Sequence, residues 1–418
     1  MSAGQGGPDG ARLAIALVHY AAPPVVGGVE RVLARHAVLL ADAGHGVRII
    51  AGRGGSPDAR VRFVGIPLLD TRHPTIERLQ GALDAGRVPA DLAEIEAAIT
   101  VLLDAALAGV DVVIAHNVCS LNLNLALTSA LRAVMDRPGS PRLILWHHDL
   151  AWSSPLYRAT LHAGRPWDLL RTVWPGAVQV VVSEARRVEL AGLMGIRPEA
   201  IAVVPNGVDL AAMWRLDRRT TGLFARADLS SAAPLLLMPS RITLRKNIEL
   251  GIRVVAEMRA AGRPAGLIVS GPADPHHPSG QAYLEELRSL RGTLGLEAAV
   301  WFLSEELDAP LSDAMIDDLY RLADVLFLSS RVEGFGLPIL EAAVNRLPIV
   351  CTDLPALREL AGDAALYIGP DDDPAEISAG ILRRIDADRL GLLAREVRSR
   401  YAWEAVYRES IAPLLATH

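Results

Sequence analysis

Residues 325–350 read VLFLSSRVEGFGLPILEAAVNRLPIV, and this stretch decides the fold class. A short apolar run leads through the loop EGFG into a helical pattern, and a second apolar run, PIVCTD, follows at 348–353. A strand, a helix and a strand in this order predict a βαβ unit, because parallel neighbours need a long crossover connection. We expect Pro338 to be the first helical residue, which puts Glu341 in the first turn of the helix.

The same alternation of short apolar runs and longer helical patterns continues through the whole chain. Short runs rich in Val, Ile and Leu are typical of parallel strands buried on both faces. They predict an α/β protein with two parallel sheets, each covered by helices, in two Rossmann-like domains. We expect strands at 13–19, 47–52, 61–67, 110–116, 142–148, 178–183, 201–206, 235–240, 266–271, 300–303, 325–330, 348–353 and 365–369.

The length of 418 residues also suits two domains. Residues 215–234 carry charge, Ser, Gly and Pro without periodicity, which is typical of a connection between domains. We therefore expect a first domain over 1–206 that also includes a C-terminal helix at about 402–418, and a second domain over 207–401. The pattern over 389–415 predicts a helix with a kink around 401–403. Residues 70–92 form a second irregular stretch, rich in Arg, His and Pro.

Composition excludes several classes of protein. The net charge is −6, from 42 basic and 48 acidic residues, so no basic surface favours a nucleic-acid partner. The polar, glycine-rich start lacks a secretory signal, and apolar runs stop short of the roughly 18 residues of a membrane span. We expect a cytoplasmic protein and leave peripheral membrane contact open. Cys119 and Cys351 are far apart, which predicts neither a disulfide nor a zinc site.

The loop EGFG is a candidate anion site. The backbone amides of residues Gly334, Phe335, Gly336 and Leu337 would lie at the positive end of a helix dipole. Glu333 in the loop and Glu341 in the helix could both face a group bound there. The alternative is that Glu341 only favours the helix dipole and Glu333 is solvated.

Two cations, Arg241 and Lys246, follow the strand at 235–240 and precede a helix. A cation at a helix start opposes the dipole and is not expected for stability, so phosphate binding is the favoured interpretation. Lys246 is the only lysine, and it lacks the glycine loop of a Walker motif. Near the start of the chain, Gly27 and Gly28 would let a ligand approach the backbone closely, or they simply form a turn.

Four segments in this order resemble the retaining glycosyltransferases of family 4. They are GGVERVL at 27–33, VVPNGVD at 203–209, SRITLRKN at 240–247 and EGFGLPILE at 333–341, and the resemblance covers nearly the whole chain. It implies the GT-B fold, with two Rossmann-like domains facing a central cleft and a C-terminal helix crossing back to the first domain. It also implies a hexosyltransferase that uses a UDP- or GDP-sugar as co-substrate, without a cofactor or a metal.

The resemblance further implies a role for each matching residue. Arg241 and Lys246 would bind the donor diphosphate, Glu333 the sugar hydroxyls and Glu341 the ribose hydroxyls. The amides of 334–337 would serve the sugar and phosphate, and Gly27 and Gly28 the phosphate from the first domain. A histidine beside the donor sugar corresponds to His148 in LILWHHDLAW, although the neighbouring His147 remains an alternative.

The acceptor and some competing functions stay open. Arg72 and Arg165, in the stretches 70–92 and 149–176, are candidates for binding a small polar or glycosidic acceptor, or they belong to surface loops. His116 with Asn117 either lines the cleft or is a satisfied histidine at a strand end. A GT-B epimerase, a glycan phosphorylase and a non-catalytic nucleotide-sugar-binding subunit are the alternative functions. The base, the hexose and the oligomeric state are not indicated.

Overall fold

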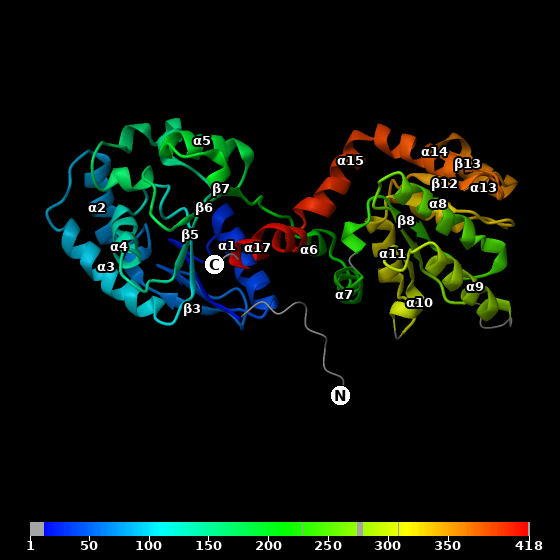
Figure 1. The fold of residues 1–418 in the computed structure, drawn as a ribbon, viewed down its shortest axis with the longest axis horizontal. Helices are drawn as coiled ribbons and strands as arrows, with labels where there is room; N and C mark the ends of the chain where they lie inside the picture. Colours follow the sequence, from blue (N-terminus) through cyan, green and yellow to red (C-terminus); the bar gives the residue numbers. More distant parts are fainter. Residues whose placement is uncertain (1–11, 228, 274–278, 308, 417–418) are drawn as a thin grey trace. The chain divides into compact units, whose positions relative to one another are not determined.

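The computed structural model describes residues 12–227, 229–273, 279–307 and 309–416, and the fold is drawn in Figure 1. Within these residues the chain divides into two compact units. Unit 1 is Met1–Gly207 with Val406–His418, and unit 2 is Val208–Ala405.

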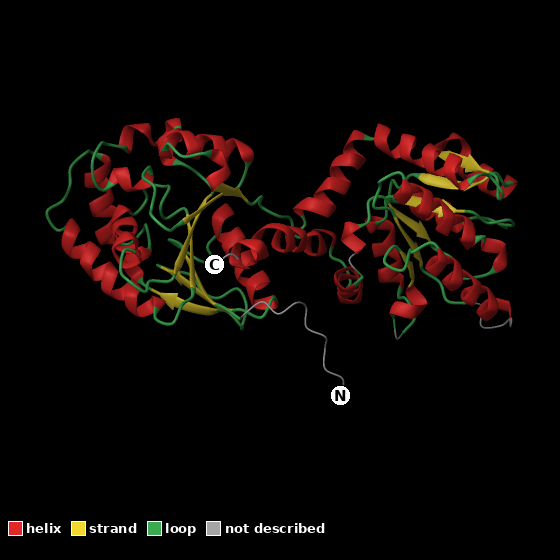
Figure 2. Cartoon of the chain, in the orientation of Figure 1, coloured by secondary structure: helices red, strands yellow, loops and turns green. Residues whose placement is uncertain are grey.

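Unit 1 contains a seven-stranded parallel sheet with the strand order β3-β2-β1-β4-β5-β6-β7. Helices flank this sheet, as Figure 2 shows. The strands are β1 (Ala14–Val18), β2 (Gly46–Ala51), β3 (Arg62–Gly65), β4 (Val112–His116), β5 (Arg142–His147), β6 (Val178–Val181) and β7 (Ile201–Val203). The helices are α1 (Gly28–Asp42), α2 (Pro74–Asp84), α3 (Leu92–Leu107), α4 (Leu125–Met135), α5 (Glu184–Met194) and, from the chain end, α17 (Ala412–Ala416).

Unit 2 contains a six-stranded parallel sheet with the strand order β10-β9-β8-β11-β12-β13. Its strands are β8 (Leu235–Met238), β9 (Gly266–Val269), β10 (Val300–Phe302), β11 (Val325–Leu328), β12 (Ile349–Thr352) and β13 (Ala365–Ile368). Its helices are α6 (Leu210–Trp214), α7 (Arg218–Arg226), α8 (Ile248–Ala260), α9 (Ser279–Thr293), α10 (Leu303–Glu306), α11 (Asp313–Leu322), α12 (Leu337–Val344), α13 (Pro355–Ala361), α14 (Pro374–Ala387) and α15 (Arg389–Glu396); α16 (Trp403–Val406) lies at the boundary with unit 1.

The predicted fold class is confirmed. Within the described residues every apolar run expected to be a strand is one, and all pair in parallel. The central strands β4 and β8 are buried along their whole length, so apolar residues at successive positions are stable there. In both sheets the order of strands reverses at one point, between β1 and β4 in unit 1 and between β8 and β11 in unit 2.

Two stretches expected to be irregular are helical instead. In residues 70–92, α2 begins at Pro74 and buries Ile76, Leu79 and Leu83 on one face. In residues 215–234, α7 begins after Asp217, whose side chain accepts a hydrogen bond from the amide of Arg219. The prediction of irregular structure was wrong in both stretches. Among their many charged residues, the apolar residues of α2 have a helical spacing and Asp217 is a typical capping residue of α7.

The C-terminal segment is interrupted where a kink was expected. After α15 a π-helical turn runs over Val397–Tyr401, and Ala402 is extended, with a ψ of 139°. Ala402 forms an isolated bridge with Val208 in unit 2. Beyond this break, Arg142 of β5 donates hydrogen bonds to the carbonyl groups of Leu414 and Leu415. Leu414 and Leu415 therefore lie against β5 of unit 1.

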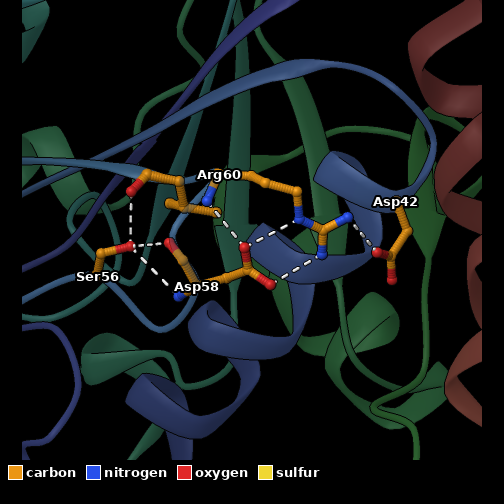
Figure 3. A network of polar contacts seen from close by, with 5 residues as sticks. Asp42, Ser56, Asp58 and Arg60 are labelled. Carbon is orange, nitrogen blue, oxygen red and sulfur yellow. Dashed lines mark hydrogen bonds and ion pairs between the residues drawn. The ribbon is translucent and has the colours of Figure 1, made fainter.

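The loop between β2 and β3 is held to α1 by Arg60 (Figure 3). The guanidinium of Arg60 donates two hydrogen bonds to Asp58, of 2.9 and 2.8 Å, and lies 2.8 Å from Asp42 at the end of α1. Hydrogen bonds from Arg60 lower the pKa of Asp58 to about 2. Ser56 completes the loop by donating to the carbonyl groups of Asp58 and Val61.

A buried ion pair anchors the π-helical turn to the sheet of unit 2. Nη2 of Arg398 lies 2.5 Å from Oδ2 of Asp324, and the two side chains are only 6% and 8% exposed. Arg398 also donates to the carbonyl groups of Leu322 and Ala232, and Asp324 accepts from the amide of Leu235 at the start of β8. The pair therefore ties the segment after α15 to the beginning of the central strands.

We expect Arg398→Ala to lower the free energy of unfolding by about 3–5 kcal/mol, because it leaves the Asp324 carboxylate buried without its partner. Arg400 lies in the same turn and pairs with Glu396, but its side chain is 67% exposed. Arg400→Ala is the matched control, with an expected loss below about 1 kcal/mol. Urea unfolding of both variants measures the difference, and equal losses would contradict the anchoring role of Arg398.

Candidate active site

The candidate donor site lies at the point where the strand order of unit 2 reverses. The chain leaves β8 toward α8, which covers the sheet on one side of this point, and leaves β11 toward α12. In open parallel sheets, loops at the carboxyl ends of two such strands diverge and leave room for a ligand. Arg241 and Lys246 follow β8, and Glu333 follows β11, so the fold brings these predicted residues to one edge of the sheet.

Lys246 and Glu333 form an ion pair there. The distance from Lys246 Nζ to Glu333 Oε2 is 2.6 Å, and the side chains are 12% and 17% exposed. Arg245 Nη1 lies 3.9 Å from the other carboxylate oxygen. Burial opposes ionisation of Glu333, but the hydrogen bond and charge of Lys246 outweigh it and lower its pKa. The sequence predicted both partners of the pair but not their contact, and it missed Arg245.

Three backbone interactions fix the loop that carries Lys246. Oγ of Ser329 donates to the carbonyl groups of Lys246 and Asn247, at 3.0 and 2.8 Å. The amide of Arg331 donates to the carbonyl group of Arg245 at 2.8 Å. Asn247, the residue directly before α8, has a positive φ of 50°, so the chain turns sharply after the lysine. The cation is therefore held by the loop that follows β11.

The glycine-bearing loop ends one residue earlier than predicted. Gly336 has a φ of 102°, and a Cβ atom at this position would lie 2.5 Å from Leu357 Cδ2. This residue must therefore be glycine. Helix α12 begins directly after it, so Leu337 is the first helical residue and Pro338 the second. Glu341 is consequently the fifth residue, and its prediction in the first turn was wrong.

Glu341 is held by a residue that sequence reasoning missed. The hydroxyl of Tyr320, on α11, donates a hydrogen bond to Oε2 of Glu341. Burial and this hydrogen bond raise the pKa of Tyr320 above its usual range. Glu341 itself is exposed on α12, while Gly334, Phe335 and Leu337 are exposed beside it. The carboxylate is thus oriented by Tyr320 and open to a ligand.

Arg241 lies apart from the ion pair. Its side chain is exposed, and the described residues give it no hydrogen-bond or ion-pair partner. Its backbone packs on Gly271, where a Cβ atom would lie 2.7 Å from Arg241 Cα. Gly271 also lines a cavity of about 420 Å³. The other lining residues follow β9, lie in α10 or the segment after it, or belong to α11: Ser270, Pro272, Leu303, Ser304, Leu307, Ala309, Pro310, Leu311 and Ile316.

In unit 1, Gly27 and Gly28 stand at the start of α1, as expected for an anion site. Gly27 is extended, and a Cβ atom there would lie 2.0 Å from Oε2 of Glu30. Oε1 of Glu30 also lies 3.8 Å from Nε2 of His19. The Glu30 carboxylate therefore occupies the space beside the helix start, and an anion bound there would have to displace it.

The two adjacent histidines after β5 have different environments. His147 is 1% exposed, and its Nε2 lies 2.8 Å from Oε1 of Gln179. His148 is 8% exposed, and its Nε2 lies 3.1 Å from Nδ1 of His116. Asn117 Oδ1 accepts a hydrogen bond from the amide of His148 at 2.7 Å. Of the two, His148 is the one that reaches the surface.

The two candidate acceptor residues lie in two separate loops of unit 1. Arg72 and Arg165 are exposed, and no hydrogen bond or ion pair within the described chain joins them. Arg165 lines a separate cavity of about 330 Å³ that also contains Val88 and Glu96. Their grouping as one acceptor site therefore stays a prediction.

The described ranges contain neither a cluster of metal-ligating side chains nor a helix suited to crossing a membrane. No group of three or more His, Cys, Asp or Glu side chains there could hold a metal ion. No helix in the same ranges is both long and apolar enough to cross a membrane.

Comparison with protein families gives two matches. Residues 26–212 match the model described as Glycosyltransferase Family 4, and residues 223–400 match Glycosyl transferases group 1. The two matches leave only the chain ends and a short central segment uncovered. The chain belongs to the family 4 glycosyltransferases. The resemblance inferred from the four motifs is thereby confirmed, and so is the GT-B class of this glycosyltransferase.

Individual relatives carry several different names. The D-inositol 3-phosphate glycosyltransferase of Kineococcus radiotolerans is 30% identical over 56% of this chain and 57% of its own. The glycosyltransferase described here thus spans about half the length of such relatives. The mannosylglucosylglycerate synthase of Thermotoga maritima is 24% identical over 95% of this chain and 93% of its own. A solved glycosyltransferase from Rickettsia africae aligns with 97% of this chain and 98% of its own, at 17% identity and a TM-score of 0.37.

The buried histidines make the stability of this glycosyltransferase sensitive to acid. Burial lowers the pKa of His147 from 6.5 to about 4, although the hydrogen bond with Gln179 opposes the shift. Below pH 6.5 the unfolded chain therefore binds a proton that the folded chain does not, so stability falls from pH 6.5 toward pH 4. For His147 alone the loss reaches about 2 kcal/mol at pH 5.

We expect His147→Gln to reduce the loss of unfolding free energy between pH 7 and pH 5 by about this amount, ~2 kcal/mol. Urea unfolding of the wild type and the variant at both pH values measures the change. Any loss of packing in the variant affects both pH values equally, so the comparison within each protein isolates the proton. The same pH dependence in both proteins would show that His147 is not the responsible group.

Proposed function

We propose that the chain transfers a hexose from a nucleoside diphosphate sugar to a hydroxyl group of a small polar or glycosidic acceptor, with retention at the anomeric carbon. Membership of the family supports sugar transfer. The observation that carries the proposal is the Lys246–Glu333 pair at the reversal point of the second sheet. It places a cation and a carboxylate side by side, which are the groups that a sugar diphosphate requires.

The cations would stabilise the departing diphosphate. Loss of the nucleoside diphosphate leaves negative charge on phosphate oxygens, and fixed cations near that charge lower the barrier. Lys246 is mostly buried, so its charge is less screened than at the surface. Arg245 and Arg241 would add charge from the same loop.

The carboxylates would position the donor. Glu333 uses Oε2 for Lys246, while Oε1 lies 3.9 Å from Nη1 of Arg245 and has a lone pair that can accept a hydrogen bond from a sugar hydroxyl. Glu341, oriented by Tyr320, can accept from the ribose hydroxyls. His148 of unit 1 would contact the sugar. Glu333 thus acts as a positioning group for the sugar and not as an assigned nucleophile.

The cavity of about 420 Å³ beside Gly271 is a suitable place for the base, because its lining is largely apolar. A thermal-shift comparison of UDP, GDP and ADP would identify the nucleotide, since the ligand bound most tightly raises the melting temperature most. Acceptors to test first are suggested by the names of the relatives, namely inositol 3-phosphate and glycerate glycosides. Release of nucleoside diphosphate that depends on the acceptor is the direct test of transfer.

Replacing the lysine tests the diphosphate site. We expect Lys246→Ala to weaken nucleoside diphosphate binding by at least about 10-fold, since a charge-assisted hydrogen bond contributes about 1.5–3 kcal/mol, and to spare nucleoside binding. Lys246→Arg should restore part of the affinity, because its planar fork differs from a point charge. Arg253→Ala, an exposed arginine on α8, is the control. Calorimetry that gives Lys246→Ala the affinity of the wild type would refute the assignment.

Chelation tests the absence of a metal requirement. We expect turnover to survive EDTA, because cations of the chain would bind the diphosphate in place of a metal ion. The measurement is the initial rate before and after exhaustive chelation. A complete loss that magnesium or manganese restores would mean that the phosphate site is incomplete without an ion.

A further inference from the structure

The reversal point of the first sheet carries a group of buried histidines. His19 follows β1, His116 ends β4, and His148 follows β5. The rings of His116 and His148 stack with centroids 5.4 Å apart and an interplanar angle of 23°. Nδ1 of His116 lies 3.1 Å from Nε2 of His148, which is a hydrogen bond between two imidazoles. Nδ1 of His19 in turn lies 2.8 Å from the carbonyl oxygen of His116.

We propose that His116 is a positioning residue that fixes the ring orientation and tautomer of His148, so that His148 presents a protonated Nδ1 as a hydrogen-bond donor to the donor sugar. The inference rests on the proposed function for the identity of the ligand. The tautomer itself is a property of the protein alone and can be tested without turnover.

The pairing requires both rings to be neutral, because only neutral imidazoles pair as one donor and one acceptor. Burial, together with the smaller effect of the nearby His36, His19 and His147, lowers the pKa of His148 to about 3. Burial also lowers the pKa of His116 well below its usual value. The Glu30 carboxylate faces His19 at 3.8 Å and is the acidic group in contact with this cluster. Both rings are therefore neutral near pH 7.

The buried Nε2 atom of His116 then determines the tautomer of both histidines. His116 is fully buried, and its Nε2 has no hydrogen-bond partner among the described residues. A proton on Nε2 would be an orphaned donor, whereas a proton on Nδ1 is used in the bond to His148. Orphaned buried N–H groups are rarer in proteins than unused acceptors, so the proton belongs on Nδ1 of His116. Nε2 of His148 must then accept, and its own proton must lie on Nδ1.

Hydrogen bonds between the Asn117 side chain and the main chain also restrict the backbone conformation of His148. Asn117 has a positive φ of 56°, and its Oδ1 accepts hydrogen bonds from the amides of both His148 and Asp149, at 2.7 and 3.2 Å. The backbone of His148 is thus fixed from one side and its ring from another. A donor held in this way suits a sugar hydroxyl oxygen, and no proton needs to be transferred to or from the imidazole.

Two variants of His116 separate a positioning role from simple packing. His116→Phe keeps the ring volume but removes the hydrogen bond, and we expect it to lower kcat by ~10- to 100-fold because the contact with the sugar is misplaced. KM for the nucleotide sugar should stay within about twofold, since the diphosphate is bound by unit 2. His116→Asn places an amide nitrogen near the position of Nδ1 and should recover most of kcat. In the His148→Ala background, His116→Phe should lower kcat no further.

Nitrogen-15 NMR of the histidine side chains tests the tautomer directly in the full-length protein. We expect His148 to carry its proton on Nδ1 in the wild type and in His116→Asn, and to become a mixture of tautomers in His116→Phe. A proton on Nε2 of His148 in the wild type would overturn the proposal, as would independent effects of His116→Phe and His148→Ala on kcat. Absence of any sugar transfer by the wild type, with the predicted tautomer present, would instead reject the proposed function alone.

Discussion

The ion pair between Lys246 and Glu333 depends on the reversal of strand order in the second sheet, and the rest of the candidate donor site depends on the ion pair. The two residues are separated by 87 positions, and only the adjacent β8 and β11 bring their loops together. Once formed, the pair satisfies two mostly buried charges, each of which would be costly alone. Ser329 and Arg331, which follow β11, then bind the backbone of the lysine loop, so the geometry of the pair is set by the sheet and not by flexible side chains.

The two reversal points have different chemistry. In unit 2 the site contains ionised groups that are partly exposed, whereas in unit 1 the corresponding edge contains neutral imidazoles that are nearly or fully buried. Cations favour phosphate groups, and neutral donors favour hydroxyl groups. The same parallel-sheet topology thus supplies an electrostatic site in one unit and a hydrogen-bonding site in the other. Glu30 beside the start of α1 strengthens this contrast, because its carboxylate makes that helix start less suited to a further anion.

Much of the fold could be predicted from the sequence, because buried parallel strands leave continuous apolar runs that need no knowledge of distant residues. Lys246 and Glu333 could also be predicted as site residues, because each lies in a short local sequence pattern that follows a strand. Their contact was not, because pairing across two strands depends on sheet order. Tyr320 was missed for the same reason, as nothing in α11 indicates a partner on α12. The error at Glu341 was local: the positive φ of Gly336 starts the helix one residue earlier than the proline suggests.

A single lysine in a chain of arginines also has a physical explanation in this geometry. Glu333 Oε2 accepts from Lys246 at 2.6 Å within a loop closed by Ser329, and the compact ammonium has three donors that can point in different directions. One donor can stay with Glu333 while the others reach a phosphate. A guanidinium bound to the same carboxylate would use both N–H groups of its planar fork in a bidentate pair. Under the proposed function, lysine is therefore the cation that can hold the carboxylate and still bind a phosphate, whereas the exposed Arg241 and Arg245 would only supply charge.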